Sequence, residues 1–229
     1  MDTTTMPPER LTAVLFDMDG TLLDSEKLWD VGLYDLAAHV GRTLDPATRA
    51  RMIGMDQTES VALLHREWDL PLLDVPANTT WLIRRMHTIF AGGVVWQPGA
   101  RELLAAVKAA GLTTALVTAT GRDLVNVIIG TIGEQNFDVT ICGDEVARNK
   151  PDPEPYLTAM TELGLRPAQC LAIEDSPTGV SSAVGAGLRV LGVPSEVPLA
   201  SAERVTIVDS LTGIDVATLI EVHRGTLVA

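Results

Sequence analysis

Short apolar runs alternate with helical patterns along most of this chain, and this alternation constrains the fold more than any other feature of the sequence. The runs at 13–16 and 170–173 end at acids and are too short for helices, so we predict that they are buried strands. Further strands are predicted at 114–117, 137–142, 189–193 and 205–208, and helices at 100–110, 122–130, 153–163, 178–186 and 211–222. Strands that alternate with helices form a parallel sheet with helices on both faces. The expected fold class is therefore α/β.

One long segment, residues 26–91, interrupts this alternation. Its apolar residues recur at helical spacing with little strand pattern, and Asp45-Pro46 is a helix start in which Asp caps and Pro takes the first position. The expected helices run from residue 26 to 40, from 46 onward, from 57 to 68 and from 76 to 90. We therefore expect an all-helical insert at 25–91 within a core domain formed by 1–24 and 92–229.

Composition and charge narrow the classes of protein that fit. A chain of 229 residues that is 46% apolar can bury a sizeable core, which excludes disorder. A net charge of -13 argues against nucleic acid as the partner, whereas a small phosphorylated ligand needs only local cations and helix N-termini. Residues 1–10 carry no secretion signal and no run is long enough to span a membrane, so a cytoplasmic protein is expected. Cys142 and Cys170 lie in apolar runs and are expected to be reduced core thiols.

Two carboxylates, Asp17 and Asp19, directly follow the first predicted strand. Side chains two apart in an extended chain point the same way, so both can converge on one ligand. From these residues alone the pair is a metal site, a catalytic pair or an ordinary Asp-Gly turn. A calcium loop is excluded, because Leu22 and Leu28 occupy the places where such a loop, counted from Asp17, needs Gly and Glu.

Polar residues follow three other predicted strands at the same end. Thr118 ends one strand, Glu174 and Asp175 end another, and Lys150 lies in the loop beyond a third. Ligands of parallel α/β sheets bind at the carboxyl ends of the strands, so these residues are expected to gather at one place. Taken alone, each of these residues is more often a helix cap or a surface charge than part of a site. Together, acids, a hydroxyl and a cation are what metal-assisted phosphoryl transfer requires.

Four segments resemble, in order and spacing, the four motifs of the haloacid dehalogenase superfamily. They are Phe-Asp-Met-Asp-Gly-Thr at 16–21, Val-Thr at 117–118, Lys-Pro-Asp-Pro at 150–153 and Ile-Glu-Asp-Ser at 173–176. The order and spacing are similar to those of the branch that carries a helical cap between the first two motifs, as in β-phosphoglucomutase and small sugar phosphatases. The resemblance covers almost the whole chain. It implies a Rossmann-like core, a helical cap domain that closes over the site, and Mg²⁺ as the cofactor.

The resemblance also implies catalytic roles. Asp17 is expected to be the nucleophile that forms an aspartyl phosphate, and Asp19 the general acid and then the general base. Dehalogenases lack the second aspartate, so Asp19 indicates phosphate chemistry. Magnesium is expected to bind Asp17, Asp175 and the main-chain carbonyl of Asp19, with Glu174 as a further ligand or a residue behind one.

The phosphoryl group of the substrate is expected to lie among several further residues. Lys150 would pair with Asp17 and with phosphoryl oxygens, and Thr118 would bind another phosphoryl oxygen. Gly20 and Ala119, which adjoin these motifs, are also expected to contact the phosphate. The partner implied is a small phosphorylated metabolite bound by a monomer or weak dimer.

The cap is expected to decide between a phosphatase and a mutase. A β-phosphoglucomutase should have a histidine shortly after the first motif and an arginine soon after a cap glycine. Trp29 and Gln57 stand at those places, and both are candidate substrate contacts, although Trp29 also fits core packing. We therefore expect a Mg²⁺-dependent phosphatase of a sugar phosphate. The alternatives are a phosphosugar mutase and an inactive binding or regulatory module.

Overall fold

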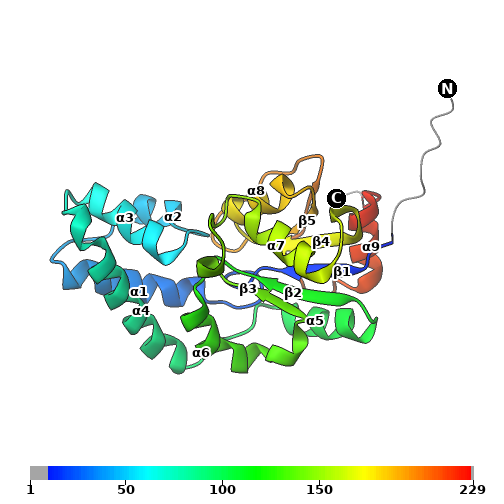
Figure 1. The fold of residues 1–229 in the computed structure, drawn as a ribbon, viewed down its shortest axis with the longest axis horizontal. Helices are drawn as coiled ribbons and strands as arrows, with labels where there is room; N and C mark the ends of the chain where they lie inside the picture. The colour runs from blue at the N-terminus through cyan, green and yellow to red at the C-terminus, as the bar shows by residue number, and fades with distance from the viewer. Residues whose placement is uncertain (1–9, 228–229) are drawn as a thin grey trace.

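The computed structural model describes residues 10–227 and contains one parallel sheet within them (Figure 1). The strands run in the order β3-β2-β1-β4-β5-β6, and every neighbouring pair is parallel. Their bounds are β1 Ala13–Phe16, β2 Thr113–Val117, β3 Val139–Ile141, β4 Cys170–Glu174, β5 Arg189–Gly192 and β6 Val205–Ile207. The expectation about a secretion signal concerns residues 1–10, almost all of which lie outside the described residues.

Helices cover both faces of this sheet. Val14 and Phe16 of β1 share an apolar cluster with α5, α6 and α9, whereas Ala13 and Leu15 share a second cluster with α7 and α8. These helices are α5 Ala100–Ala109, α6 Arg122–Ile132, α7 Glu154–Leu163, α8 Pro177–Gly185 and α9 Val216–Arg224. Burial on both faces explains why the strands are continuous apolar runs rather than alternating ones. The predicted fold class is confirmed.

Between β1 and α5 the chain forms a helical insert, residues 26–91, which lies at one end of the sheet (Figure 1). Its helices are α1 Glu26–His39, α2 Pro46–Arg51, α3 Gln57–Glu67 and α4 Val75–Ala91. Helices α1 and α3 pack on α4, and α4 in turn packs on α6 of the sheet layer. The chain enters and leaves the insert side by side, because Asp24 N donates to Val95 O at 2.9 Å and Gln97 N to Leu22 O at 2.8 Å.

Several predicted bounds differ by one or two residues from those in the structure, and two elements differ more, each with a clear local cause. The last helix begins at Val216 rather than at residue 211, because Gly213 takes a φ of 80° and the Asp215 side chain caps the helix by accepting from Thr218 N. The predicted strand at 137–142 is reduced to β3, because a 3₁₀ turn precedes it. The 3₁₀ turns are η1 Leu72–Asp74, η2 Glu134–Asn136, η3 Gly143–Glu145 and η4 Pro167–Gln169.

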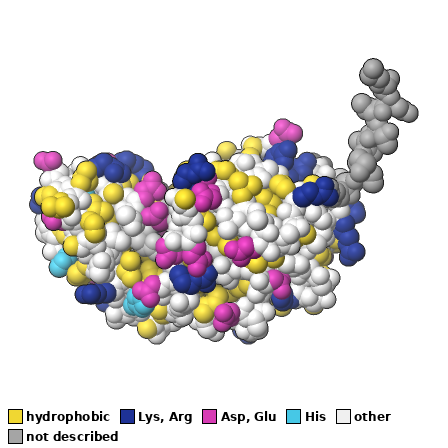
Figure 2. Space-filling view, in the orientation of Figure 1, with side chains coloured by type: hydrophobic (Ala, Val, Ile, Leu, Met, Phe, Trp, Pro, Cys, Tyr) yellow, Lys and Arg dark blue, Asp and Glu magenta, His cyan; other side chains and the backbone are white. Residues whose placement is uncertain are grey.

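Other expectations concern surface and core chemistry. Cys142 and Cys170 are free thiols and are buried, as predicted. Within residues 10–227, none of the helices is both long enough and apolar enough to traverse a bilayer. On the face seen in Figure 2, acidic and basic side chains are interspersed rather than gathered into one basic patch.

Candidate active site

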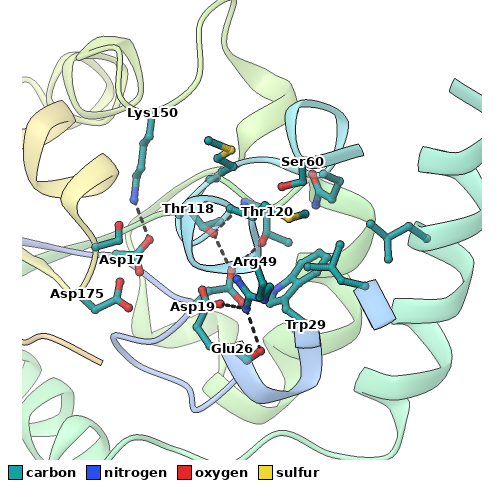
Figure 3. Close-up of a pocket in the computed structure, with 18 residues that line it drawn as sticks. Asp17, Asp19, Glu26, Trp29, Arg49, Ser60, Thr118, Thr120, Lys150 and Asp175 are labelled. Atoms are coloured by element: carbon teal, nitrogen blue, oxygen red, sulfur yellow. Dashed lines mark hydrogen bonds and ion pairs between the residues drawn. The ribbon is translucent and has the colours of Figure 1, made fainter. Parts of the chain in front are cut away.

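The register of three neighbouring strands brings the polar residues of the sequence motifs together. Phe16 of β1 lies beside Leu116 of β2 and Ile173 of β4, so the three strands end within one residue of one another in register. Asp17 N still donates to Ile173 O at 3.1 Å, which holds the aspartate at this edge. Figure 3 shows Asp17, Thr118, Lys150 and Asp175 around one cavity.

Lys150 is the centre of the buried charges at this edge. Its Nζ lies 2.7 Å from Asp17 Oδ1, 2.7 Å from Glu174 Oε1 and 2.8 Å from the Val117 carbonyl oxygen, which uses all three ammonium donors. The ammonium also lies 5.2 Å from the centre of the Tyr156 ring, and the Tyr156 hydroxyl donates to Glu174 Oε1 at 2.6 Å. Lys150 is therefore fixed against Asp17 in one orientation.

Acids outnumber cations in this buried cluster, and the pKa values reflect it. Burial raises the pKa of Asp17 to about 8; Lys150 opposes this effect, and Glu174 adds to it. Burial, with Asp17 and Glu174 nearby, also holds the pKa of Asp175 well above its usual range. Burial acts to lower the pKa of Lys150, but the two adjacent carboxylates outweigh it and raise that pKa. The cluster is thus short of positive charge.

The donor set of this cluster fits a hard divalent cation. Asp17, Glu174 and Asp175 each offer a carboxylate oxygen, and the three oxygens lie within 4.8 Å of one another. Asp17 Oδ2 and Glu174 Oε2 are buried without a hydrogen-bond partner among the described residues. Buried unpartnered carboxylate oxygens are costly, and a metal ion would satisfy them. Oxygen ligands are those that Mg²⁺ prefers; the contribution of the Asp19 carbonyl stays a prediction.

Two glycines make room for the carboxylates of the buried cluster. Gly20 takes a φ of 77°, and a Cβ there would collide with the Asp175 carboxylate. A Cβ at Gly179 would collide with the Glu174 carboxylate in the same way. The Asp175 oxygen that lies against Gly20, Oδ2, accepts a hydrogen bond from the Ser195 hydroxyl. The predicted phosphate contact of Gly20 stays a prediction, whereas its clearance role was not expected from the sequence.

The Asp19 carboxylate accepts hydrogen bonds from both the insert side and the sheet side of the cavity. Ser25 Oγ at 2.6 Å and Trp29 Nε1 at 3.0 Å donate to Oδ1 from the insert side. Thr120 Oγ1 at 2.7 Å and Thr118 Oγ1 at 3.4 Å donate to Oδ2 from the sheet side. Thr120 was missed in the sequence analysis, and Thr118 contacts Asp19 here. Its expected contact with a phosphoryl oxygen stays a prediction.

Trp29 fits both roles that the sequence left open for it, a contact in the cavity and packing within the core. Its ring lines the cavity and packs edge-on against Phe90, with ring centroids 5.7 Å apart. Its indole nitrogen is the donor to Asp19. The residue therefore joins the apolar interior of the insert to the carboxylate expected to transfer protons.

A buried ion pair on the insert side was not found from the sequence. Arg49 of α2 donates through Nη2 to Glu26 Oε2 at 2.6 Å and through Nε to Asp30 Oδ1, and Glu26 and Arg49 both line the cavity (Figure 3). Burial raises the pKa of Glu26 to about 7, with Arg49 opposing this effect. The pairing depends on where the Arg49 side chain of α2 reaches α1 in the folded chain, so the sequence pattern around Arg49 carried no signal for it.

The strand ends of the sheet form one wall of a cavity, the sheet-side wall, and the helical insert forms the other, the insert-side wall. The cavity has an empty volume of about 540 Å³, including the part open to solvent. Ala119 and Lys150 line the sheet side, and Gln57 and Ser60 contribute polar groups from α3. The apolar lining comes from the insert: Trp29, Leu33, Met52, Met55 and Leu82. This volume and mixed lining are typical of small-molecule sites.

A parallel sheet with acids, a lysine and a threonine at its strand ends defines a class of phosphoryl-transfer hydrolases. The chain belongs to the haloacid dehalogenase-like hydrolase family, whose model matches residues 14–193. The predicted family is thereby confirmed.

Several individual members are similar over most of the chain. Protein CbbY of Rhodobacter capsulatus is 37% identical over 201 residues, which cover 81% of this chain and 86% of CbbY. A phosphorylated carbohydrates phosphatase of Thermotoga maritima is 32% identical, over 80% of this chain and 85% of that protein. The crystal structure of a mutant CbbY from Rhodobacter sphaeroides in complex with xylulose-(1,5)bisphosphate has a TM-score of 0.80 at 29% identity, covering 91% of this chain and 99% of that chain.

Proposed function

We propose that this chain is a Mg²⁺-dependent phosphatase that hydrolyses a small phosphorylated metabolite, most simply a sugar phosphate, through an aspartyl phosphate on Asp17. The observation that carries the proposal is Asp17 itself, with one oxygen held by Lys150 at 2.7 Å and the other buried without a partner among the described residues. The relatives named as phosphatases of phosphorylated carbohydrates support the same substrate class.

In the first step a carboxylate oxygen of Asp17 attacks phosphorus. The Asp17 O–P bond forms while the P–O bond to the leaving alkoxide breaks, and Asp19 donates its proton to that alkoxide. Hydrogen bonds from Trp29 and Thr120 hold the Asp19 carboxyl group facing the cavity. Lys150 neutralises part of the charge that develops as two anions approach.

In the second step water takes the place of the alcohol. Asp19, now a carboxylate, accepts a proton from the water that attacks phosphorus, and the Asp17 O–P bond breaks to release phosphate. Asp17, Glu174 and Asp175 would hold the Mg²⁺ ion, which supplies positive charge to the phosphoryl oxygens when bound. We further propose that residues 25–91 act as a cap domain over the core formed by 1–24 and 92–229.

Phosphate release from a panel of sugar phosphates and p-nitrophenyl phosphate tests this function. Wild type should release phosphate with Mg²⁺ and not with a chelator, and Asp17→Asn and Asp19→Ala should each lower kcat by at least about 10³-fold. Asp74→Asn, at an exposed aspartate that makes no capping bond, is the matched control and should keep wild-type activity. Isomerisation without phosphate release would indicate the mutase instead, and full activity of Asp17→Asn would disprove the covalent route.

A further inference from the structure

The insert-side wall of the cavity offers hydrogen-bond donors without surplus positive charge. Arg49 is its cation, and Arg49 is already paired with two carboxylates, Glu26 and Asp30. A third bond runs from Nη2 to the main-chain oxygen of Glu26 at 3.3 Å. The guanidinium is therefore neutralised within the insert before any substrate binds.

The sheet-side wall has no spare cation either. Lys150 is the second cation that lines the cavity among the described residues, and Asp17 and Glu174 bind it. The acids that line the cavity are Asp17, Asp19, Glu26 and Asp175. A bound divalent ion offsets part of this negative charge next to one phosphoryl group. A second phosphate at the insert end would face carboxylates, and like charges in contact cost several kcal/mol.

Neutral donors are nevertheless available at the insert end. Gln57 lines the cavity and is 9% exposed, and its amide Nε2 is buried without a hydrogen-bond partner among the described residues. The Nη1 atom of the charged Arg49 guanidinium also makes no hydrogen bond within the described part of the chain, but it is not a fully buried atom. An unpartnered buried donor is costly, and a substrate hydroxyl is the natural acceptor for it.

Apolar side chains line the same cavity as these donors. Trp29, Leu33, Met52 and Leu82 form this surface. Such a surface packs against the C–H groups of a sugar or polyol, while the flanking donors bind its hydroxyls. The cavity therefore combines charged, apolar and neutral polar lining residues.

We propose that Gln57 and Arg49 select phosphate monoesters whose far end is uncharged and hydroxylated, and that the site discriminates against sugar bisphosphates. This inference rests on the proposed phosphatase function of the same site. The substrate class is accordingly a sugar or polyol monophosphate. Gln57 acts as a specificity residue, because it supplies a donor without the charge that a second phosphate requires.

Steady-state kinetics with three esters of matched carbon number test this inference. Glucitol monophosphate carries hydroxyls on its carbon chain, and fructose bisphosphate carries a second, charged phosphate group as well. Hexyl phosphate carries neither hydroxyls nor a second phosphate group. Wild type should favour glucitol monophosphate over fructose bisphosphate by at least about a hundredfold in kcat/KM. Gln57→Leu should lower kcat/KM for glucitol monophosphate about tenfold more than for hexyl phosphate, because it removes one hydrogen bond. Gln57→Arg should narrow the gap between monophosphate and bisphosphate by about tenfold.

The outcomes separate this inference from the proposed function. Gln135→Leu makes the same substitution at an exposed position far from the cavity and should leave all the ratios unchanged. Equal turnover of monophosphate and bisphosphate, or an equal loss on both monoesters in Gln57→Leu, would overturn the inference while phosphatase activity remained. Failure to release phosphate from any ester, p-nitrophenyl phosphate included, would overturn the phosphatase function itself. Circular dichroism of each variant establishes that it is folded.

Discussion

The two walls of the cavity are both built around a buried cation between carboxylates, yet they differ in what holds them. On the sheet side Lys150 lies between Asp17 and Glu174, which come from the ends of β1 and β4. On the insert side Arg49 of α2 lies between Glu26 and Asp30, both of α1. The first group leaves two buried carboxylate oxygens unpartnered among the described residues, whereas no carboxylate oxygen of the second group is both buried and unpartnered there.

The two walls are therefore suited to different parts of substrate binding. The sheet-side wall is short of positive charge, so it is suited to recruit a metal ion and a phosphoryl group. The insert-side wall is balanced within itself, so it is suited to shape and to hydrogen bonding rather than to charge recognition. Substitutions that alter the charged residues of one wall at a time test this difference.

Removing the sheet-side cation should have the largest effect. Lys150→Met leaves Asp17 and Glu174 facing each other, and we expect kcat/KM to fall by about 10³-fold, the upper range for losing one charge-stabilising group. Burial already raises the pKa of Asp17, and without Lys150 that pKa should rise further. Phosphate release over a pH series measures both effects. Lys108→Met on α5 is the control, and near-normal activity of Lys150→Met would show that the sheet-side charge balance is irrelevant to turnover.

Removing the insert-side cation should chiefly affect stability. Arg49→Met leaves Glu26 buried without its partner, which costs about 3 kcal/mol in the free energy of unfolding. The folded pKa of Glu26, about 7, lies above its ordinary value of 4.5 and should rise further in the variant. A raised carboxyl pKa means that the folded state binds more protons, so stability falls as pH rises through that range. Urea unfolding should therefore show a small deficit at pH 5 and a larger one at pH 8.

A double variant checks the cause of that deficit. Arg49→Met with Glu26→Gln removes both charges, so most of the lost stability should return and the added pH dependence should disappear. A deficit that stayed the same in the double variant would mean that packing of Arg49, rather than its charge, stabilises the insert.

Magnesium should stabilise the folded protein through the sheet-side carboxylates and not through the insert-side ion pair. In the proposed site the ion would bind the folded sheet-side carboxylates, so at a hundred times its dissociation constant it should add about 2.7 kcal/mol to the free energy of unfolding. Asp175→Asn should lose most of this gain, whereas Glu26→Gln should keep it. Thermal unfolding with Mg²⁺ and with a chelator measures the gain. An equal gain in all three proteins would place the ion elsewhere.

The smallest effect is expected where the insert meets the sheet layer. His87 Nε2 of α4 lies 2.8 Å from Asp123 Oδ2 of α6, but their side chains are 36% and 73% exposed. Exposed pairs contribute little, so His87→Gln should change the free energy of unfolding by less than about 0.5 kcal/mol. A larger loss in chemical unfolding would show that this contact fixes the two walls relative to each other.

The sheet-side wall could be predicted from the sequence because strand ends are local signals. Asp17, Thr118 and Asp175 each follow a short apolar run, and the parallel register then places them at one edge. Even there, the four donors around Asp19 were not predictable, since they depend on side-chain directions in loops.

The ion pair of the insert-side wall could not be predicted, because its contacts depend on how helices cross. Helical periodicity shows which residues face inward, but it does not show which residue of a neighbouring helix they meet. Glu26 and Arg49 are 23 positions apart, and no spacing rule links them. Gln57 was singled out by resemblance, yet its unpartnered amide became visible in the structure alone.

The antiparallel crossing at the base of the insert has an evolutionary consequence. Leu23 and Trp96 form a bridge there, so the 72 intervening residues begin and end at adjacent points of the fold. The strand that carries Asp17 and the strand that leads to Thr118 are paired independently of what lies between them. One contiguous stretch of gene can thus be exchanged for another as a cassette, which changes the metabolite recognised while the inherited chemistry stays intact.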